Sequence, residues 1–535
     1  MPAAEHSRSS RQGIAPSSQI GPTSGILPTS GNGSTNGAAD AAEPSAKSAF
    51  SPPRLTAATS SARRISAAPP SERRFAAIGP PMSIAARHAA MGPVVCGRAG
   101  DHPDVYQLLL AVFQGPSREE FYASQDEPSY DPGNRLLIRH NGRLVAHLQL
   151  IRRTMGFGPL RLPVDRLAWL ATLPEFRSQG VARALLNVAA TGAAANGAAS
   201  RNAGDCGDGA FGADAGEPIA REKAGPPWGL LRTRIPRFFH RWGWAVCGRH
   251  SRSRARARNI LARYWADPAL RTTPLNIRLW RHVELSALMR IYARNTIAAF
   301  GPPLRSEAYW RWLISRKAFD HIVVAIAGPD KLELDEASAP IVGYAVVRQK
   351  RIVELLTDPA YPHAGPQLLA RACSDAIERD QQEIELEAPP SDPLHRFVAA
   401  ADGQFFHREM EEQEVFMVRR PAVAALVRCV APLWESRLRE SGMSRACELG
   451  LLVGQEKHLL TVARRGTRSI PGRLSRNYIA CSSTEFTRLV MGHSNPTEAA
   501  DGGRLTASTQ VALELAGILF PRIETWHPAW DDLAC

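Results

Sequence analysis

The stretch RSQGVA at residues 177–182 decides the fold of this chain. It follows a run of mostly apolar residues at 167–173, which Pro174 closes, and it leads directly into an alanine- and leucine-rich segment at 180–191. This order predicts a buried strand, a tight turn and a new helix. Gly180 lets the backbone approach an anion closely, and the first amides of a helix are free to bind one. The segment therefore predicts a cradle for a pyrophosphate group.

Two other phosphate-binding loops do not fit this segment. No Gly-Lys-Ser or Gly-Lys-Thr follows, as an ATP loop requires, and the Gly-x-Gly-x-x-Gly spacing of a dinucleotide fold is missing. An ordinary strand-to-helix turn would also fit six residues taken alone, so the preceding sequence matters. Strand-like runs at 135–139 and 144–152 flank Asn141-Gly142, a dipeptide typical of tight hairpins. A second turn at 156–159 leads into a further strand at 160–163.

Length and composition predict about three folded units in a soluble protein. The chain has 535 residues, of which 44% are hydrophobic and 22% charged. Its eight cysteines show no paired Cys or Cys/His spacing, so we expect neither a disulfide framework nor a metal site. No run of about 18 apolar residues and no signal-peptide pattern is present, which favours the cytoplasm and argues against a membrane partner.

The net charge of +14 is concentrated in two stretches that we expect to be unfolded, the tail before residue 91 and a loop at 249–258. Solvated flexible charge is the simplest interpretation, with attraction of an anionic substrate or cofactor as the alternative. Nucleic-acid binding is disfavoured because the basic run at 250–258 has no interleaved aromatic residues to read bases.

Four parts follow from composition and periodicity. Residues 1–90 are rich in Ala, Ser, Pro and Gly and are expected to be a disordered tail; a transit peptide, or translation from Met82 or Met91, are alternatives. Residues 91–270 form the first predicted domain, with a mobile insertion at 191–227. The remaining two predicted domains span 271–420 and 421–535.

The hairpin, the second turn, the buried strand and the cradle occur in the order seen in GNAT-superfamily acetyltransferases. Residues 94–248 resemble these proteins, whose motif is Arg/Gln-x-x-Gly-x-Gly/Ala. The resemblance implies an α/β (α+β) fold in which helices flank a mixed central sheet. It also implies that acetyl-CoA is the co-substrate.

The rest of the chain resembles the Eis-like acetyltransferases, which add a second, degenerate GNAT-like domain and a sterol-carrier-like α+β C-terminal domain. Residues 355–369 repeat the order of strand, loop and helix, but Pro366 removes a backbone donor from the loop. Residues 486–492 and the apolar positions near 515–521 resemble the closing domain, for which an unrelated helical domain is the alternative. Likeness to this group also implies a homo-oligomer, a hexamer.

The resemblance assigns cofactor contacts residue by residue. The backbone of Leu170, Ala171 and Thr172 is expected to run beside the pantetheine arm, where amides can also bind the developing oxyanion. Arg234 and Ile235 are expected near the cofactor. The residues expected to hold the pyrophosphate are Ser178, Gln179, Gly180, Val181, Ala182 and Arg183.

The catalytic groups depart from the family pattern. Phe239 occupies the position of the general-acid tyrosine and cannot donate a proton, although a thiol pKa of about 8.5 lets the thiolate leave with little help. His240 is a candidate substitute, with an idle histidine as the alternative. The family's general base is the terminal carboxylate, which here belongs to Cys535. Asp531 and Asp532 are nearby candidates, for which surface exposure is the simpler expectation.

The acceptor is expected to be a primary amine, either a small molecule or lysine, and polyamine and amino sugar remain open. Trp228, Trp242 and Trp244 could line its pocket, but aromatic residues are more commonly core residues. The alternative function is a catalytically silent module that binds acyl-CoA or a small apolar ligand.

Overall fold

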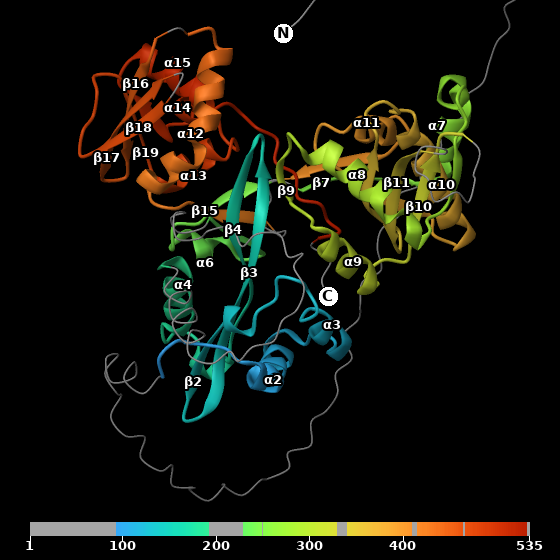
Figure 1. The fold of residues 1–535 in the computed structure, drawn as a ribbon, viewed down its shortest axis with the longest axis horizontal. Helices are drawn as coiled ribbons and strands as arrows, with labels where there is room; N and C mark the ends of the chain where they lie inside the picture. Colours follow the sequence, from blue (N-terminus) through green and yellow to red (C-terminus); the bar gives the residue numbers. More distant parts are fainter. Residues whose placement is uncertain are drawn as a thin grey trace, which may run out of the picture. The chain divides into compact units, whose positions relative to one another are not determined.

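The computed structural model describes residues 92–191, 228–248, 250–328, 340–408, 415–443, 445–463 and 466–531. The predicted tail, almost all of the predicted insertion and Cys535 lie outside these residues. The strands of the described part form three sheets of eight, seven and five strands (Figure 1). Its helices include none that is both long and apolar enough to cross a membrane.

The first sheet has the order β1-β2-β3-β4-β5-β15-β6, with β9 added beside β3. Only β4 and β5 among its pairs run parallel, so the sheet is mixed. Its strands are β1 (Val95–Cys96), β2 (Arg135–His140), β3 (Arg143–Phe157), β4 (Leu160–Thr172), β5 (Trp228–Thr233), β6 (Ala245–Gly248), β9 (Phe300–Pro303) and β15 (Val415–Arg419). The accompanying helices are α2 (His102–Phe113), α3 (Arg118–Ala123), α4 (Val181–Thr191) and α6 (Pro236–His240).

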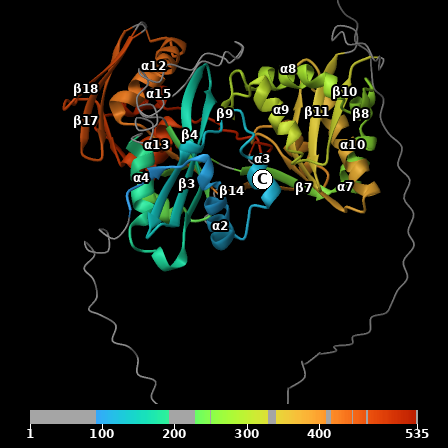
Figure 2. The ribbon, with the colours of Figure 1, turned by 60° about the horizontal axis from the view of Figure 1, so that its bottom comes forward.

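Local sequence explains the hairpins of this sheet. Asn141 and Gly142 have φ angles of 49° and 80°, as a two-residue turn between β2 and β3 requires. The next turn is centred on Gly158, within the predicted range of 156–159, and β3 and β4 are single long strands rather than several short ones. Helices α2 and α4 lie on either side of β3 and β4 (Figure 2), which explains why β3 is buried on both faces over most of its first half.

The second sheet has the order β14-β7-β13-β12-β11-β10-β8. All its pairs are antiparallel except β12 with β13. Its strands are β7 (His250–Arg256), β8 (Asn276–Leu279), β10 (His321–Ile326), β11 (Ile341–Arg348), β12 (Arg351–Thr357), β13 (Glu383–Glu387) and β14 (Gln404–Arg408). Its helices are α7 (Ala257–Ala266), α8 (Leu285–Thr296), α9 (Glu307–Ser315), α10 (Ala364–Glu378) and α11 (Pro393–Ala399).

The expectation that residues 249–258 form an unfolded basic loop is wrong. Residues 250–258 build β7 and the start of α7, and β7 lies between β14 and β13 in the second sheet, while Arg249 lies outside the described residues. Ser251, Ser253 and Ala255 are buried on one face, while the alternate arginines pair with carboxylates of β13, as in Arg252–Glu385. The strict two-residue alternation of the sequence is a strand signal that the arginine content obscures.

The chain changes sheet at other points than the predicted domain limits of 270 and 420. Strand β7 already belongs to the second sheet, whereas β9 and β15 return to the first. Strand β15 is inserted between β5 and β6, pairing Met417 with Leu231 on one side and with Val246 on the other. The first sheet is therefore completed by residues that follow the second sheet in sequence.

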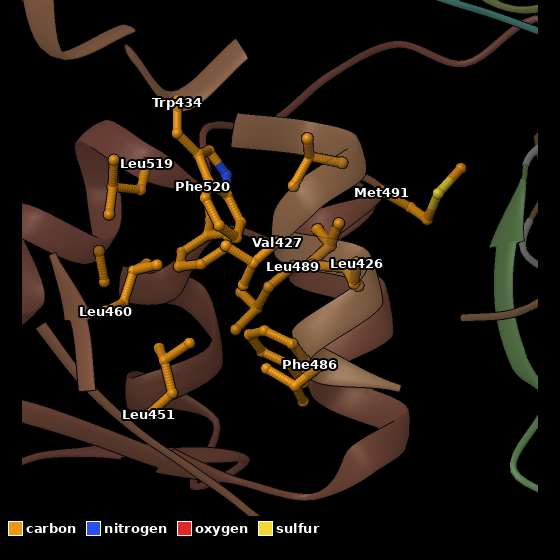
Figure 3. Packing of buried hydrophobic residues seen from close by; sticks show 14 of the residues in the cluster. Leu426, Val427, Trp434, Leu451, Leu460, Phe486, Leu489, Met491, Leu519 and Phe520 are labelled. Carbon is orange, nitrogen blue, oxygen red and sulfur yellow. The ribbon is translucent and has the colours of Figure 1, made fainter. Parts of the chain in front are cut away.

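The third sheet has the order β18-β17-β16-β19-β20, and its buried residues form one core cluster with residues of the first sheet such as Phe157 and Trp228. Side chains from helices and strands converge there, and Phe520 contacts both Trp434 and Phe486 edge-on (Figure 3). The assignment of this part as sterol-carrier-like stays a prediction. Its elements are α12 (Val423–Glu440), β16 (Cys447–Val453), β17 (Glu456–Ala463), β18 (Gly466–Pro471), β19 (Tyr478–Cys481), α13 (Ser483–Val490), α14 (Pro496–Asp501), β20 (Leu505–Ala507) and α15 (Gln510–Leu519).

Residues 520–531, here named the C-terminal strap, connect all three parts. Ile523 donates from its amide to the Gly492 carbonyl at 2.9 Å, and Trp526 donates to the Phe300 carbonyl at 2.8 Å. The ring of His527 stacks on that of Phe416 with centroids 4.2 Å apart. The strap thus runs from the third part, past β9 and β15 of the first sheet, towards the second.

Candidate functional site

The pairing between the parallel strands β4 and β5 ends about halfway along β4. Their pairing runs from Val164 opposite Trp228 to Leu167 opposite Leu231 and then stops. Beyond this point, within the described residues, no strand pairs with β4 on its β5 side. The edge of β4 that follows Leu167 therefore offers backbone groups to a ligand.

A bulge interrupts β4 at this opening. The register with β3 shifts between His147 and Gln149, and Trp169 has a φ of 54°. The Trp169 carbonyl accepts a hydrogen bond of 2.9 Å from Nδ1 of buried His147. Because the carbonyl and the next amide of a trans peptide point in opposite directions, the Leu170 N–H points away from His147. The bulge thus turns one amide of β4 away from β3.

A buried arginine stands behind this histidine. Arg135 donates from Nη1 to His147 Nε2 at 3.1 Å and from Nε to the Tyr130 hydroxyl at 2.8 Å. His147 is therefore the neutral tautomer with hydrogen on Nδ1. Burial, and then the charge of Arg135, lower the pKa of His147 to about 3. Burial also lowers the pKa of Arg135, which is only 1% exposed.

The predicted pyrophosphate segment forms the turn before α4. Ser178 and Gly180 have φ angles of 60° and 79°, and α4 begins at Val181. No carbonyl of the described residues accepts from the amides of Val181, Ala182 and Arg183, as expected for the first turn of a helix. The left-handed turn and the helix start would fit a pyrophosphate group.

A cavity of about 840 Å³ lies at the strand opening. Of the predicted site residues, Leu170, Arg234, Ile235 and Phe239 line it. Ala171, Thr172, His240 and the segment 178–183 do not line it; β4 runs from the cavity at Leu170 to the cradle. Other parts of the wall come from α2, α3, β2 and β3, and from the second sheet at Arg348 and Arg351.

Of the residues predicted around the missing tyrosine, Phe239 lines the cavity and His240 does not. Phe239 is 7% exposed and packs edge-on against Trp244, with centroids 6.2 Å apart. His240 is exposed and donates from Nδ1 to the Trp244 carbonyl at 3.0 Å, which engages it away from the cavity. Trp228 and Trp244 are core residues, and the half-buried Trp242 lies under the guanidinium of Arg183 at 5.2 Å.

The expectation that Asp531 is a surface residue is wrong. Its side chain is 8% exposed and bonds to Arg305 at 2.6 Å and to the Tyr309 hydroxyl at 3.0 Å. Arg305 is fully buried and also pairs with Glu354 at 2.6 Å. Its guanidinium lies 4.0 Å from the centroid of the Tyr292 ring. This cluster fixes the end of the C-terminal strap at the cavity wall, and Asp532 and Cys535 follow outside the described residues.

The second strand–loop–helix segment is closed to a pyrophosphate. The amides of Ala364 and Gly365 donate to carbonyls of the preceding loop, at 3.0 and 3.4 Å, and Pro366 has no amide hydrogen. Leu394 of α11 packs against Gly365, 3.4 Å from the position that a Cβ atom would take there. The start of α10 thus differs from the start of α4, whose first amides have no carbonyl partner among the described residues.

Comparison with known proteins identifies the class to which the first sheet belongs. Residues 97–200 match the family model of the acetyltransferase (GNAT) domain. This match shows that the chain carries a GNAT acetyltransferase domain. A search of the curated proteins found no match.

Comparison with solved structures shows that the similarity of fold extends over most of the chain. A GCN5-related N-acetyltransferase from Kribbella flavida has a TM-score of 0.56 at 15% identity, covering 82% of this chain and 99% of its own. One from Anabaena variabilis has a TM-score of 0.57 with the same identity and coverage. Eis1 from Mycobacterium abscessus has a TM-score of 0.51 at 15% identity, again covering 82% and 99%. The fold is thus similar to that of Eis.

Sequence reasoning missed the polar residues behind the bulge and those that the second sheet contributes. Arg135 and His147 are polar residues within otherwise apolar strands, a local signal that was available. Arg348 and Arg351 carry no such signal, because only the tertiary fold brings them to the cavity.

Proposed function

We propose that the GNAT domain transfers the acetyl group of acetyl-CoA directly to a primary amine. The observation that carries this proposal is the opening between β4 and β5, with the bulge at Trp169 on its edge and a left-handed turn at the start of α4 beyond it. The backbone of Leu170 to Thr172 would bind the pantetheine arm, and residues 178–183 the pyrophosphate. Bound acetyl-CoA supplies an activated acyl group as a thioester.

The protein's part is to orient the amine, stabilise negative charge and move two protons. The amine nitrogen attacks the carbonyl carbon, so that a C–N bond forms and the C–S bond breaks. The amine loses one proton and the departing thiolate gains one. The Leu170 amide would donate to the developing oxyanion, because the bulge holds it away from His147.

Two features bear on the proton transfers. Phe239 offers no acid, so the thiolate leaves without one or takes its proton from solvent. The terminal carboxylate of Cys535 remains the proposed base. Asp531, four residues before it, lines the cavity, and four extended residues span roughly 14 Å at most. Asp531 itself is held by Arg305 and Tyr309, which disfavours it as the base.

Calorimetric titration with acetyl-CoA, combined with measurement of thiol release on an amine panel, tests the proposal. Gly180→Glu would abolish binding, because it adds a Cβ at a φ of 79° and a negative charge where the pyrophosphate would bind. The matched control is Gly454→Glu, which makes the same change at a φ of 62° in an open turn of the third part. Unchanged binding in Gly180→Glu would overturn the proposed site.

The rival function is a silent acyl-CoA module, favoured by Phe239 and by the closed second copy. It predicts binding that Gly180→Glu abolishes, but no amine-dependent thiol release from the intact protein. The hexamer implied by the family resemblance stays a prediction, which light scattering would test.

A further inference from the structure

The cavity contains more positive charge than its own carboxylates can balance. Eight arginines and three carboxylates line it. Each carboxylate already has a partner: Glu120 accepts from the Ser117 amide, Glu127 pairs with Arg153, and Asp531 pairs with Arg305. The cavity thus lacks an unengaged carboxylate, among the described residues, that could attract a second ammonium group.

In the described part of the chain, no carboxylate partner is found for the cavity residues Arg135, Arg234 and Arg348. Arg234 is exposed on the β5 side and is already proposed for the cofactor. Arg135 and Arg348 remain; the first is an almost fully buried residue of β2, and the second comes from β11.

Of the two residues, Arg135 is the stronger indication of a bound anion, because it is almost fully buried and its partners are neutral. Its contacts are the Tyr130 hydroxyl, the neutral His147 ring and the face of the Phe121 ring, 5.1 Å from the guanidinium carbon. A buried cation without an anionic partner is costly, so such sites are commonly completed by a bound anion. Arg135 lines the cavity and can therefore meet a ligand there.

The position of Arg135 sets the distance between an anion bound there and the bulge of β4, where the acetyl group would react. One imidazole ring, with hydrogen bonds of 3.1 and 2.9 Å at its two nitrogens, separates the guanidinium from the Trp169 carbonyl. This spacing is roughly 8 Å, the length of a short aliphatic chain. A ligand anchored at Arg135 would thus carry its other end to the bulge of β4.

We propose that the acceptor is a primary amine that also carries an anionic group, carboxylate or phosphate, bound by Arg135 with Arg348 at the cavity wall. This inference rests on the proposed acetyl transfer. Among the acceptors left open by the sequence, it disfavours polyamines and polycationic amino sugars. An amino acid, or a lysine beside an acidic group, has the required chemistry.

A panel of acceptors with matched chain length tests the inference in the full-length protein. The acceptors are 6-aminohexanoate, 6-aminohexyl phosphate, hexylamine and 1,6-diaminohexane, each assayed by thiol release from acetyl-CoA. We expect kcat/KM to be about tenfold or more higher for at least one of the anionic acceptors than for the other two, as for a charge-assisted contact. The better of the two anionic acceptors identifies the anionic group. A preference for hexylamine or 1,6-diaminohexane would overturn the inference.

Variants separate anion binding from structural support. Arg348→Gln should lower kcat/KM for the preferred anionic acceptor by about three- to tenfold and change that for hexylamine by less than about twofold. Arg135→Met should lower it by about ten- to a hundredfold, with partial rescue in Arg135→Lys. Equal losses for anionic and neutral acceptors in both variants would mean that these arginines only support the fold. Arg428→Gln, an exposed cation on α12, is the control for net charge.

Binding of unreactive anions distinguishes failure of this inference from failure of the proposed function. If no amine accelerates thiol release, the proposed acetyl transfer is wrong. Calorimetry with hexanoate and hexyl phosphate still tests the anion site in that case. Binding that Arg348→Gln weakens and Arg428→Gln leaves unchanged would support an anion site in a silent module. Absence of binding to the intact protein would overturn the anion site as well.

Discussion

Arg305 and Asp531 form an ion pair of 2.6 Å although 226 residues separate them in sequence. Arg305 is fully buried, and its second partner is Glu354, from the strand β12. The pair therefore fastens the C-terminal strap to the second sheet. Burial disfavours a charged arginine, but the two carboxylates outweigh it and hold its pKa well above the usual range.

Asp531→Asn should destabilise the protein by about 2–4 kcal/mol, because it leaves a buried cation with one carboxylate less. Urea unfolding at neutral pH would measure the loss. Glu307→Gln is the control, since it breaks an exposed pair with Arg311 on α9 and should cost less than about 0.5 kcal/mol. Equal costs for the two substitutions would contradict the role of the buried pair.

Gly301→Ala tests the contact between the strap and β9. A Cβ atom at this position would lie 2.5 Å from the Trp526 carbonyl oxygen, and φ is 108°. We expect a loss of about 2–4 kcal/mol in unfolding free energy. Gly328→Ala has a similar φ of 115° with open space around it, so it should cost only about 1 kcal/mol. The difference between the two variants measures the clash with the strap, and the absence of a difference would argue against that contact.

The neutral state of His147 predicts a pH dependence of stability. Its pKa is about 3 in the folded protein and about 6.5 when unfolded, so the unfolded chain binds the extra proton first as pH falls. The stability that His147 contributes is complete above pH 6.5 and is lost at about 1.4 kcal/mol per pH unit between pH 6 and 4. His147→Gln should remove this part of the slope in urea unfolding measured against pH. An identical slope in the variant would show that His147 does not contribute.

Phe239→Tyr should restore an acid at the cavity wall. If the thiolate leaves unassisted in the native protein, a tyrosine at this position should raise kcat by about tenfold, at the low end for general acid catalysis. Thiol release under saturating substrate measures the effect. Phe238→Tyr is the matched control, because Phe238 precedes Phe239 in the same helix and is not among the cavity residues. Equal rates in the two variants would mean that proton supply does not limit turnover.

Local signals in the sequence predict much of the first sheet. The Asn141-Gly142 turn and the strand–turn–helix order around Gly180 each follow from residues that are adjacent in the chain. The alternation of serines and arginines in β7 is an equally local strand signal, which the high arginine content obscures. These elements are encoded within about ten residues.

The candidate site depends on contacts that local signals do not contain. Arg135 meets His147 because β2 and β3 pair, and Arg348 reaches the cavity from another sheet. The sequence alone predicts an exposed Asp531, but in the structure this residue is buried in an ion pair with Arg305. Such contacts depend on tertiary packing, which spacing and composition in one sequence do not specify.

The insertion of β15 between β5 and β6 has a consequence for how the protein is made. During synthesis, β5 and β6 leave the ribosome well over a hundred residues before Val415–Arg419, the segment that must lie between them. The edges of β5 and β6 that pair with β15 therefore stay unpaired until almost four fifths of the chain has been translated. Fragments cut near residue 270 should be prone to aggregation in cells, and coexpression of the missing strand as a peptide should improve their solubility.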